Sequence, residues 1–430
     1  MNPLAVELND IISHKSPAVF SLLSKRGKQI FFPKKGILAQ AAEAKGKAIN
    51  ATIGEAVEDD ATPMRLESIA SKVSLNPKQI FPYAPSFGLP ALREKWKTMI
   101  AQKNPSLLGK DYSLPVVSSA LTHGLSMAGY LFLDEGDTLL IPDISWDNYS
   151  LIFGNGYGAK LETFPLFNGD GLDLEGFRHA LLAGEAQKKV VLFNFPNNPT
   201  GYSLTTNEAV QIQKIVLEAA EKGHLIVAII DDAYFGLVYE NGIETESLFA
   251  RLADVHSHVL AIKLDGPTKE DYVWGLRIGF MTYGIRLGTK ELYTALEAKT
   301  AGAIRGNISN ASHLGQSLLL QAYEASTYAA EKDVKFNTLN ARYTAVKKTL
   351  ATHPEYAEQF EPLPFNSGYF MCVTLKNGLD CERVRQILLN EFDTGLINLS
   401  GVLRIAFSAV SAEVIPVIFE NIYKACLKAV

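Results

Sequence analysis

Between residues 225 and 232 the chain reads Leu225-Ile226-Val227-Ala228-Ile229-Ile230-Asp231-Asp232, six consecutive apolar residues followed by two carboxylates. A short apolar run rich in β-branched residues predicts a strand buried on both faces, as in a largely parallel sheet covered by helices. Similar runs occupy residues 189–194, 258–262 and 277–281. We therefore expect an α/β fold in which polar residues collect at the strand ends, where open α/β sheets bind their ligands.

The segments around these runs predict the rest of the architecture. Residues 206–222 and 121–133 have helical apolar spacing, and residues 369–375 and 402–407 resemble strands separated by a helix over 382–390. This pattern indicates a large domain with a mixed, mostly parallel sheet, followed by a smaller α+β domain. The expected division is an N-terminal arm over 1–48 that contributes to the small domain, a large domain over 49–310, a connecting helix over 311–345 and a small domain over 346–430.

Composition excludes several classes of protein. The 430 residues include 41 Lys+Arg and 46 Asp+Glu, and the resulting net charge of −5 argues against a nucleic-acid surface. Three cysteines are too few for a disulfide framework or a zinc site, so we expect no metal. No apolar run approaches the roughly 20 residues that span a bilayer, and the N-terminus lacks the pattern of a signal peptide. We expect a cytoplasmic protein without a membrane partner.

Four polar motifs lie at or near the ends of the predicted strands. They are, in order, Asn197-Asn198-Pro199-Thr200-Gly201, Asp231-Asp232-Ala233-Tyr234, Gly266-Pro267-Thr268-Lys269, and Arg277 eight residues further on. Each has an ordinary explanation when taken alone. The Asn-Pro-Gly segment could be a simple turn, the aspartates could cap a helix or bind a metal, and the lysine and arginine could be solvated surface charges. Their order, and their shared position at strand ends, points instead to one common site.

In this order the motifs resemble the class I/II aminotransferases, which are fold type I enzymes that use pyridoxal 5′-phosphate (PLP). The aspartate and aromatic aminotransferases give the nearest pattern, and the resemblance covers nearly the whole chain. Further segments resemble the same family: Ile49-Asn50-Ala51-Thr52-Ile53-Gly54, Tyr83-Ala84-Pro85-Ser86-Phe87-Gly88-Leu89, Ser119-Ala120-Leu121 and Ile144-Ser145-Trp146-Asp147-Asn148-Tyr149.

The resemblance implies specific roles around the cofactor. Lys269 would hold PLP as a Schiff base and then move the proton between the substrate and the cofactor. Asp231 would bond the pyridine nitrogen, so that the ring withdraws electrons. Asn198 and Tyr234 would hydrogen-bond the phenolic oxygen of the cofactor, and Trp146 would stack on its ring.

The resemblance also implies a phosphate site and a substrate site. The phosphate would bind at the start of a helix, where backbone amides and the helix dipole favour anions. Its expected contacts are Ser119, Ala120, Leu121, Thr268, Arg277 and, from a neighbouring subunit, Tyr83, which implies a homodimer with shared active sites. Gly54 and Asn198 would line the substrate site, and Arg404 would bind the α-carboxylate through a bidentate pair. Arg305 stands where relatives that prefer dicarboxylates carry an arginine that crosses the dimer.

Two features depart from the family pattern. Gly266 occupies a position where the family often has a serine phosphate ligand, and the segment 266–271 is more acidic than usual. Lys263 is the only other lysine nearby, but it lies fourteen residues before Arg277 instead of eight, and within a predicted strand. Lys269 is therefore the expected Schiff-base residue.

We expect transfer of an amino group from an α-amino acid, either aspartate or an aromatic one, to a 2-oxo acid such as 2-oxoglutarate. A PLP-dependent β-lyase or decarboxylase on the same scaffold is the alternative, because cofactor motifs do not fix the reaction. An effector-sensing regulator is disfavoured, because only about 48 residues precede the first matched motif and no basic recognition helix is visible among them.

Overall fold

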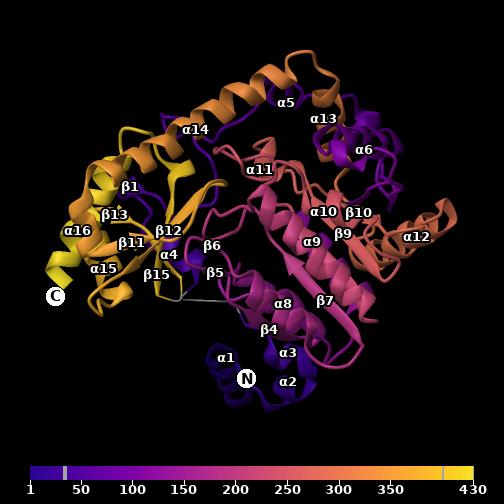
Figure 1. Cartoon of the computed structure of the whole chain (residues 1–430), viewed down its shortest axis with the longest axis horizontal. Coiled ribbons are helices and arrows are strands. Elements are labelled where there is room, and N and C mark those ends of the chain that lie inside the picture. The colour runs from indigo at the N-terminus through magenta and orange to yellow at the C-terminus, as the bar shows by residue number, and fades with distance from the viewer. Residues whose placement is uncertain (32–35, 400, 430) are drawn as a thin grey trace.

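The computed structural model of the chain describes residues 1–31, 36–399 and 401–429. Two sheets dominate it, and helices surround both (Figure 1). The larger sheet has seven strands in the order β2-β10-β9-β8-β7-β3-β4. Their bounds are β2 (Val116–Ser118), β3 (Thr138–Pro142), β4 (Lys160–Phe164), β7 (Lys188–Phe193), β8 (Leu225–Asp231), β9 (Val259–Asp265) and β10 (Gly279–Gly284).

The strands β4, β3, β7, β8 and β9 pair in parallel, and β10 runs antiparallel to both of its neighbours. The expectation of a mixed, mostly parallel sheet is confirmed. The predicted strand over 277–281 begins two residues later than expected. Arg277 has φ 54°, a left-handed backbone conformation that is incompatible with a strand.

The central strands are buried on both faces. Along β8, Ala228 and Ile230 belong to one hydrophobic core, whereas Val227 and Ile229 belong to a second core on the other side of the sheet. This alternation follows from the period of two along a strand, and it explains why the sequence shows an unbroken apolar run.

Helices cover both faces. On the first side lie α8 (Leu174–Leu182), α9 (Thr206–Glu221) and α10 (Leu248–Leu252), and on the second side lie α7 (Ala120–Phe132) and α12 (Lys290–Asn307). A capping box starts α9, in which Thr205 and Glu208 each bond the other's backbone N–H. Further short elements are α5 (Glu67–Ala70), α6 (Pro90–Lys103), α11 (Pro267–Glu270), β5 (Phe167–Asn168), β6 (Gly171–Leu172) and a π-helix, η3 (Ser150–Asn155).

The smaller, C-terminal sheet is antiparallel, with the order β11-β12-β15-β14. Its strands are β11 (Phe360–Pro362), β12 (Phe370–Leu375), β14 (Ile397–Leu399) and β15 (Val402–Ala406), accompanied by α15 (Cys381–Glu391) and α16 (Ile415–Ala429). Beside it, β1 (Ile49–Asn50) pairs in parallel with β13 (Thr394–Gly395). A segment from the start of the chain therefore joins the C-terminal unit. The exact domain boundaries stay a prediction.

The expected single helix over 311–345 is wrong. The segment contains two helices, α13 (His313–Glu324) and α14 (Tyr328–Thr352), and the first ends at Ala325, which is extended at φ −73° and ψ 133°. Ser326 and Thr327 follow, and such residues hydrogen-bond the backbone locally and favour helix ends over helix interiors. The long helix α14 then runs to the C-terminal sheet (Figure 1).

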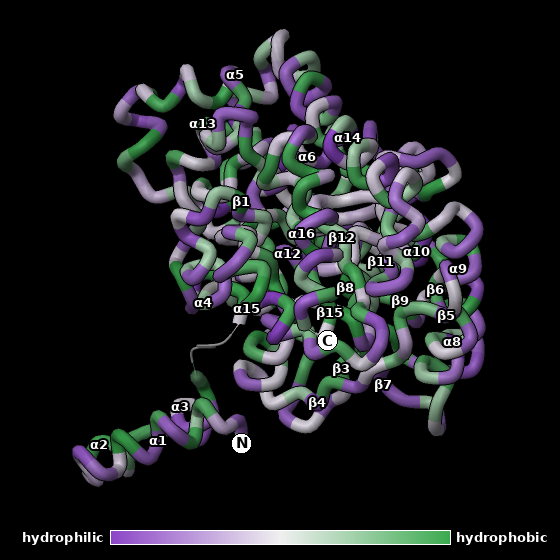
Figure 2. Tube along the Cα trace, turned by 90° about the vertical axis from the view of Figure 1, so that its left-hand side faces the viewer, coloured by the Kyte–Doolittle hydropathy of each residue, from purple (hydrophilic) through white to green (hydrophobic). Residues whose placement is uncertain are grey.

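A group of three N-terminal helices projects from the rest of the chain (Figure 2). These helices are α1 (Pro3–Lys15), α2 (Pro17–Leu22) and α3 (Lys25–Gln29). Lys25 pairs with Glu135 at 2.7 Å, and Asn155 Nδ2 donates to the carbonyl of Gln29 at 3.0 Å. The next helix, α4 (Ile37–Glu43), packs beside β13 and β14. Among the described residues, no helix has the length and apolar character needed to cross a bilayer.

Candidate functional site

A cavity of about 510 Å³ lies between the two sheets, at the carboxyl ends of β7, β8 and β9. Eleven of the residues predicted from the sequence line it: Gly54, Ala120, Leu121, Trp146, Asn198, Asp231, Tyr234, Thr268, Lys269, Arg277 and Arg404. Segments that are more than 300 residues apart in the sequence therefore meet at one place, and the parallel strands of the larger sheet bring most of them there.

Lys269 lies on the short helix α11, which directly follows β9, and its side chain reaches into the cavity. The amine is 4.9 Å from the centre of the Tyr234 ring. Burial lowers the pKa of Lys269 to about 8; Asp231 opposes this shift and Arg277 adds to it. A lysine with this pKa carries a free amine in a useful fraction of molecules near neutral pH, which is the form that attacks a carbonyl.

Asp231 ends β8 and is 3% exposed. Tyr149 donates a hydrogen bond of 2.6 Å to Oδ2, and the N–H of Ala233 donates one of 3.2 Å to Oδ1. Burial raises the pKa of Asp231, and the bond from Tyr149 opposes this rise by favouring the charged form. Burial also raises the pKa of Tyr149 well above its ordinary value, so the phenol remains a donor.

Arg404 approaches from β15 and connects the two sheets at the site. Nη1 donates to Asn198 Oδ1 at 3.2 Å, and Nη2 donates to the carbonyl of Thr52 at 2.8 Å. The guanidinium lies 4.3 Å from the centre of the Phe370 ring, and its Nε is buried without a partner. Burial lowers the pKa of Arg404. The group nonetheless stays charged at neutral pH, and a carboxylate is the ligand that suits it.

The N-terminus of α7 opens onto the same cavity. Ala120 has φ 62°, and the first residue of β10 lies so close that a Cβ on Gly279 would come within 2.6 Å of the Ala120 carbonyl carbon. A Cβ on Gly266 would meet Gly279 Cα and the Ile278 carbonyl oxygen at 3.0 Å each. Close backbone packing at this point therefore explains why residue 266 is a glycine.

Three predicted residues do not line the cavity. Ser119 precedes α7, and its N–H donates to His123 Nδ1 at 3.1 Å. Tyr83 is 88% exposed, and Arg305 lies on the exposed side of α12, where Nη1 contacts Ser309 Oγ at 3.4 Å. Since the roles expected for Tyr83 and Arg305 involve the site of a neighbouring subunit, these roles stay predictions.

Sequence reasoning missed several residues of the cavity: Glu55, Tyr149, Asn194, Trp274 and Phe370. Tyr149 and Asn194 carried a usable signal in the sequence. Tyr149 ends the aromatic segment 144–149, and Asn194 ends the apolar run 189–194 that forms β7. Asn194 donates to the Asp231 carbonyl at 3.0 Å and accepts the N–H of Asn198 at 2.9 Å, so it connects two strand ends. No local signal marked Phe370, which reaches the site only through packing of the C-terminal sheet.

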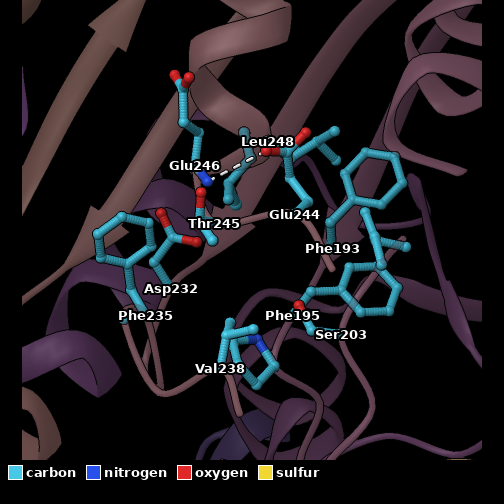
Figure 3. Close-up of a pocket in the computed structure, with 14 residues that line it drawn as sticks. Phe193, Phe195, Ser203, Asp232, Phe235, Val238, Glu244, Thr245, Glu246 and Leu248 are labelled. Carbon is cyan, nitrogen blue, oxygen red and sulfur yellow. Dashed lines mark hydrogen bonds between the residues drawn. The ribbon is translucent and has the colours of Figure 1, made fainter. Parts of the chain in front are cut away.

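Lys263 does not line the cavity. It is buried in β9, where it pairs with Asp232 and lies 3.4 Å from Asp265. Asp232 also borders a separate hollow of about 20 Å³, which has room for one water molecule (Figure 3). The Glu246 N–H donates to Glu244 Oε1 at 3.2 Å beside this hollow. No group of three His, Cys, Asp or Glu side chains in the described part of the chain is placed to hold a metal ion.

Comparison with solved structures shows that the chain has the fold of aminotransferases. An aminotransferase from Anaerococcus prevotii superposes with a TM-score of 0.83 at 24% identity, covering 94% of this chain and 98% of the other. The cytoplasmic aspartate aminotransferase of Saccharomyces cerevisiae superposes with a TM-score of 0.77 at 18% identity, covering 96% and 100%.

Sequence comparison identifies the family. The family described as aminotransferase class I and II matches residues 48–422, and the chain therefore belongs to it. Aspartate aminotransferases from Bacillus sp. (strain YM-2) and S. cerevisiae are 28% identical over 247 residues and 24% identical over 312 residues. These matches cover 57% and 70% of this chain, and they span 59% of the Bacillus enzyme and 73% of the yeast enzyme.

PLP is the cofactor of this family, and the residues present in the cavity fit it. The Thr268 hydroxyl is buried without a hydrogen-bond partner in the described structure, and it stands near the start of α7 and Arg277, where a phosphate would need donors. A buried carboxylate, a lysine with a lowered pKa and an indole line the same space. These groups suit PLP, which carries a phosphate, an aromatic ring and an aldehyde.

Proposed function

We propose that the protein is an aminotransferase that moves an amino group from an α-amino acid, aspartate or an aromatic one, to a 2-oxo acid such as 2-oxoglutarate. The single observation that carries this proposal is the buried Lys269 amine, with its pKa lowered to about 8, in the cavity that also holds the buried Asp231 carboxylate. Membership of the class I and II family supports it.

In this proposal each residue has a defined task. Bound PLP supplies an electrophilic carbon and a ring that stabilises negative charge at the substrate Cα. Lys269 binds the cofactor and then, once its amine is free, carries the Cα proton. Asp231, whose charged form is favoured by the hydrogen bond from Tyr149, would pair with the ring nitrogen. Asn198 and Tyr234 contact the phenolic oxygen of the ring, and Trp146 packs against its face.

The remaining residues orient the two anionic groups. Ser119, Ala120, Leu121, Thr268 and Arg277 are proposed to hold the phosphate. Arg404 would bind the α-carboxylate of the substrate. Its hydrogen bond to Asn198, the residue proposed to contact the PLP ring, fixes the guanidinium beside the proposed place of that ring. Gly54 leaves room for the substrate, because a Cβ there would lie 3.1 Å from the Phe370 ring.

We further propose a cytoplasmic homodimer with shared active sites and with the domain boundaries expected from the sequence, except that α13 and α14 take the place of a single connecting helix. Large exposed apolar residues support a contact between two copies: Val73 is 61%, Phe81 79% and Tyr83 88% exposed. In the dimer, Tyr83 would reach the phosphate of the other subunit, and Arg305 would reach the substrate side chain there.

Lys269→Ala tests the central claim. Purified wild-type protein with added PLP should show a visible absorbance band that aspartate or an aromatic amino acid removes and 2-oxoglutarate restores. Lys269→Ala should lose both the band and the turnover, whereas Lys347→Ala, whose Nζ pairs with Glu240 at 3.0 Å far along α14, should keep them. Release of pyruvate or ammonia in place of the amino exchange would indicate a β-lyase and contradict the proposal.

A further inference from the structure

The two residues that follow Lys269 enter a cluster of buried charges. Glu270 Oε1 pairs with Lys103 of α6 at 2.5 Å and with Lys332 of α14 at 2.7 Å. Lys332 also lies 3.1 Å from Asp271 Oδ1. The Asp271 side chain is completely buried, and the side chains of Glu270 and Lys332 are 11% and 21% exposed.

Two tyrosines complete the cluster. Tyr323 of α13 donates to Asp271 Oδ2 at 2.8 Å, and Tyr328 of α14 donates to Asp271 Oδ1 at 2.7 Å. A further bond reaches the turn from the C-terminal sheet, because Tyr369 Oη donates to the Lys269 carbonyl at 2.8 Å. Three helices and the smaller sheet therefore hold the backbone that carries Lys269.

One helix connects this cluster to the other side of the site. On α14, Lys335 pairs with Glu58 at 2.5 Å, and Arg342 donates to the carbonyls of Val57 and Ser408 at 2.6 Å each. Val57 and Ser408 follow closely after Gly54 and Arg404 in the sequence. Ten residues separate Lys332 from Arg342, which corresponds to about 15 Å of helix. The helix thus contacts both the Lys269 turn and the segments that carry the substrate side of the cavity.

We propose that Glu270 and Lys332 are positioning residues that join the Lys269 turn to α14, and that their paired charges keep the net charge beside Lys269 at zero. This inference rests on the proposed function. The cluster contains two carboxylates and two ammonium groups, so its charges balance. Burial opposes ionisation of Glu270, but Lys103 and Lys332 lower its pKa, and Glu270 therefore contributes its negative charge to this balance.

The balance matters because an unpaired charge in this cluster acts on Lys269 through a medium of low dielectric. Lys269 itself faces Asp231 of β8, Arg277 before β10 and the Tyr234 ring. Beyond its own members, the cluster faces three further charged or titratable groups: Glu58, Asp265 and Tyr272. Loss of one ion from a balanced set leaves a net unit charge beside the turn.

The test uses full-length protein with PLP bound and two variants of opposite sign. The measurement is the pH midpoint at which the cofactor's visible absorbance changes. Lys332→Met leaves the cluster with one excess negative charge and should raise the midpoint, since negative charge favours the protonated form. Glu270→Gln leaves one excess positive charge and should lower it. We expect shifts of opposite sign in the two variants, each of about half to one pH unit.

Matched variants separate the effect of net charge on the midpoint from a general loss of folding stability. The double variant Glu270→Gln/Lys332→Met restores the charge balance and should return the midpoint toward the wild-type value. Lys332→Arg should also keep it, and Lys347→Met, on the same helix but paired with Glu240, should leave it unmoved. If Lys332→Met does not fold, Glu270→Gln, which preserves the shape of the side chain, still tests the sign.

Midpoints that stay at the wild-type value in both single variants, even with lowered thermal stability, would overturn this inference while leaving the proposed function intact. A wild-type protein that shows no cofactor band would instead contradict the proposed function. These two failures are therefore distinguishable in the same experiment.

Discussion

The hydrogen bond from Tyr149 to Asp231 makes a quantitative prediction about stability and pH. Tyr149→Phe removes the 2.6 Å donor and leaves Asp231, which is 3% exposed, with the Ala233 N–H at 3.2 Å. A hydrogen bond to a charged group contributes about 1.5–3 kcal/mol. We expect Tyr149→Phe to lower the free energy of unfolding of the cofactor-free protein by this amount at a pH above the pKa of Asp231.

The sign of the pH dependence follows from the state that the bond stabilises. Tyr149 favours the charged form of Asp231, so its contribution is present above the pKa of that carboxyl and is lost as the pH falls through it. Removing the phenol raises the pKa of Asp231 further. The stability difference between Tyr149→Phe and wild type should therefore shrink as the pH falls through the pKa of Asp231, as measured by urea denaturation at a series of pH values.

Tyr283→Phe provides the control, because Tyr283 is an equally buried tyrosine whose hydroxyl lies 2.5 Å from the neutral Thr300 hydroxyl. Its loss should cost about 0.5–1.5 kcal/mol, and this cost should not vary with pH over the same range. A loss in Tyr149→Phe that is equally independent of pH would refute the assignment of an ionised Asp231.

Three further predictions concern the substrate side and the phosphate side of the cavity. Arg404→Lys should lower kcat/KM for the amino acid by about tenfold or more, because an ammonium cannot form the bidentate pair, while the cofactor absorbance stays unchanged. Arg305→Ala should reduce the ratio of kcat/KM for aspartate over that for a neutral amino acid; an unchanged ratio would exclude a dicarboxylate role for Arg305. Gly266→Ser should lower stability by about 1–3 kcal/mol in a denaturation experiment, because its Cβ meets the backbone of Gly279 and Ile278 at 3.0 Å. A variant with wild-type stability and tighter PLP binding would show that the backbone adjusts at no cost.

Much of the larger sheet could be predicted from the sequence because its signals are local. The apolar runs of β7, β8 and β9 alternate between two cores, and each is followed by polar residues that the parallel pairing brings together. Asn198, Asp231 and Lys269 could therefore be placed at one site without coordinates. The break between α13 and α14 was missed because the residues at the break carry only a weak preference against helix.

The contacts that the sequence could not reveal depend on tertiary packing. Phe370 reaches the site through the C-terminal sheet, and nothing in its neighbourhood signals a ligand. Glu270 and Asp271 appeared only as an unusually acidic loop. Their partners, Lys103 and Lys332, lie on helices that are distant in the sequence, so their neutralisation could be recognised only in three dimensions.

The pairing of distant segments also has a consequence for synthesis on the ribosome. β2 pairs with β10, more than 150 residues later in the chain, and β1 pairs with β13 near residue 394. A nascent chain that has emerged only as far as Lys269 therefore already contains the cavity's lysine and carboxylate but leaves the edge of β9 open. Such an edge attracts other unpaired strands. We expect this protein to depend on chaperone protection until β10 emerges, and to gain its competent site only after Arg404 of β15 has emerged.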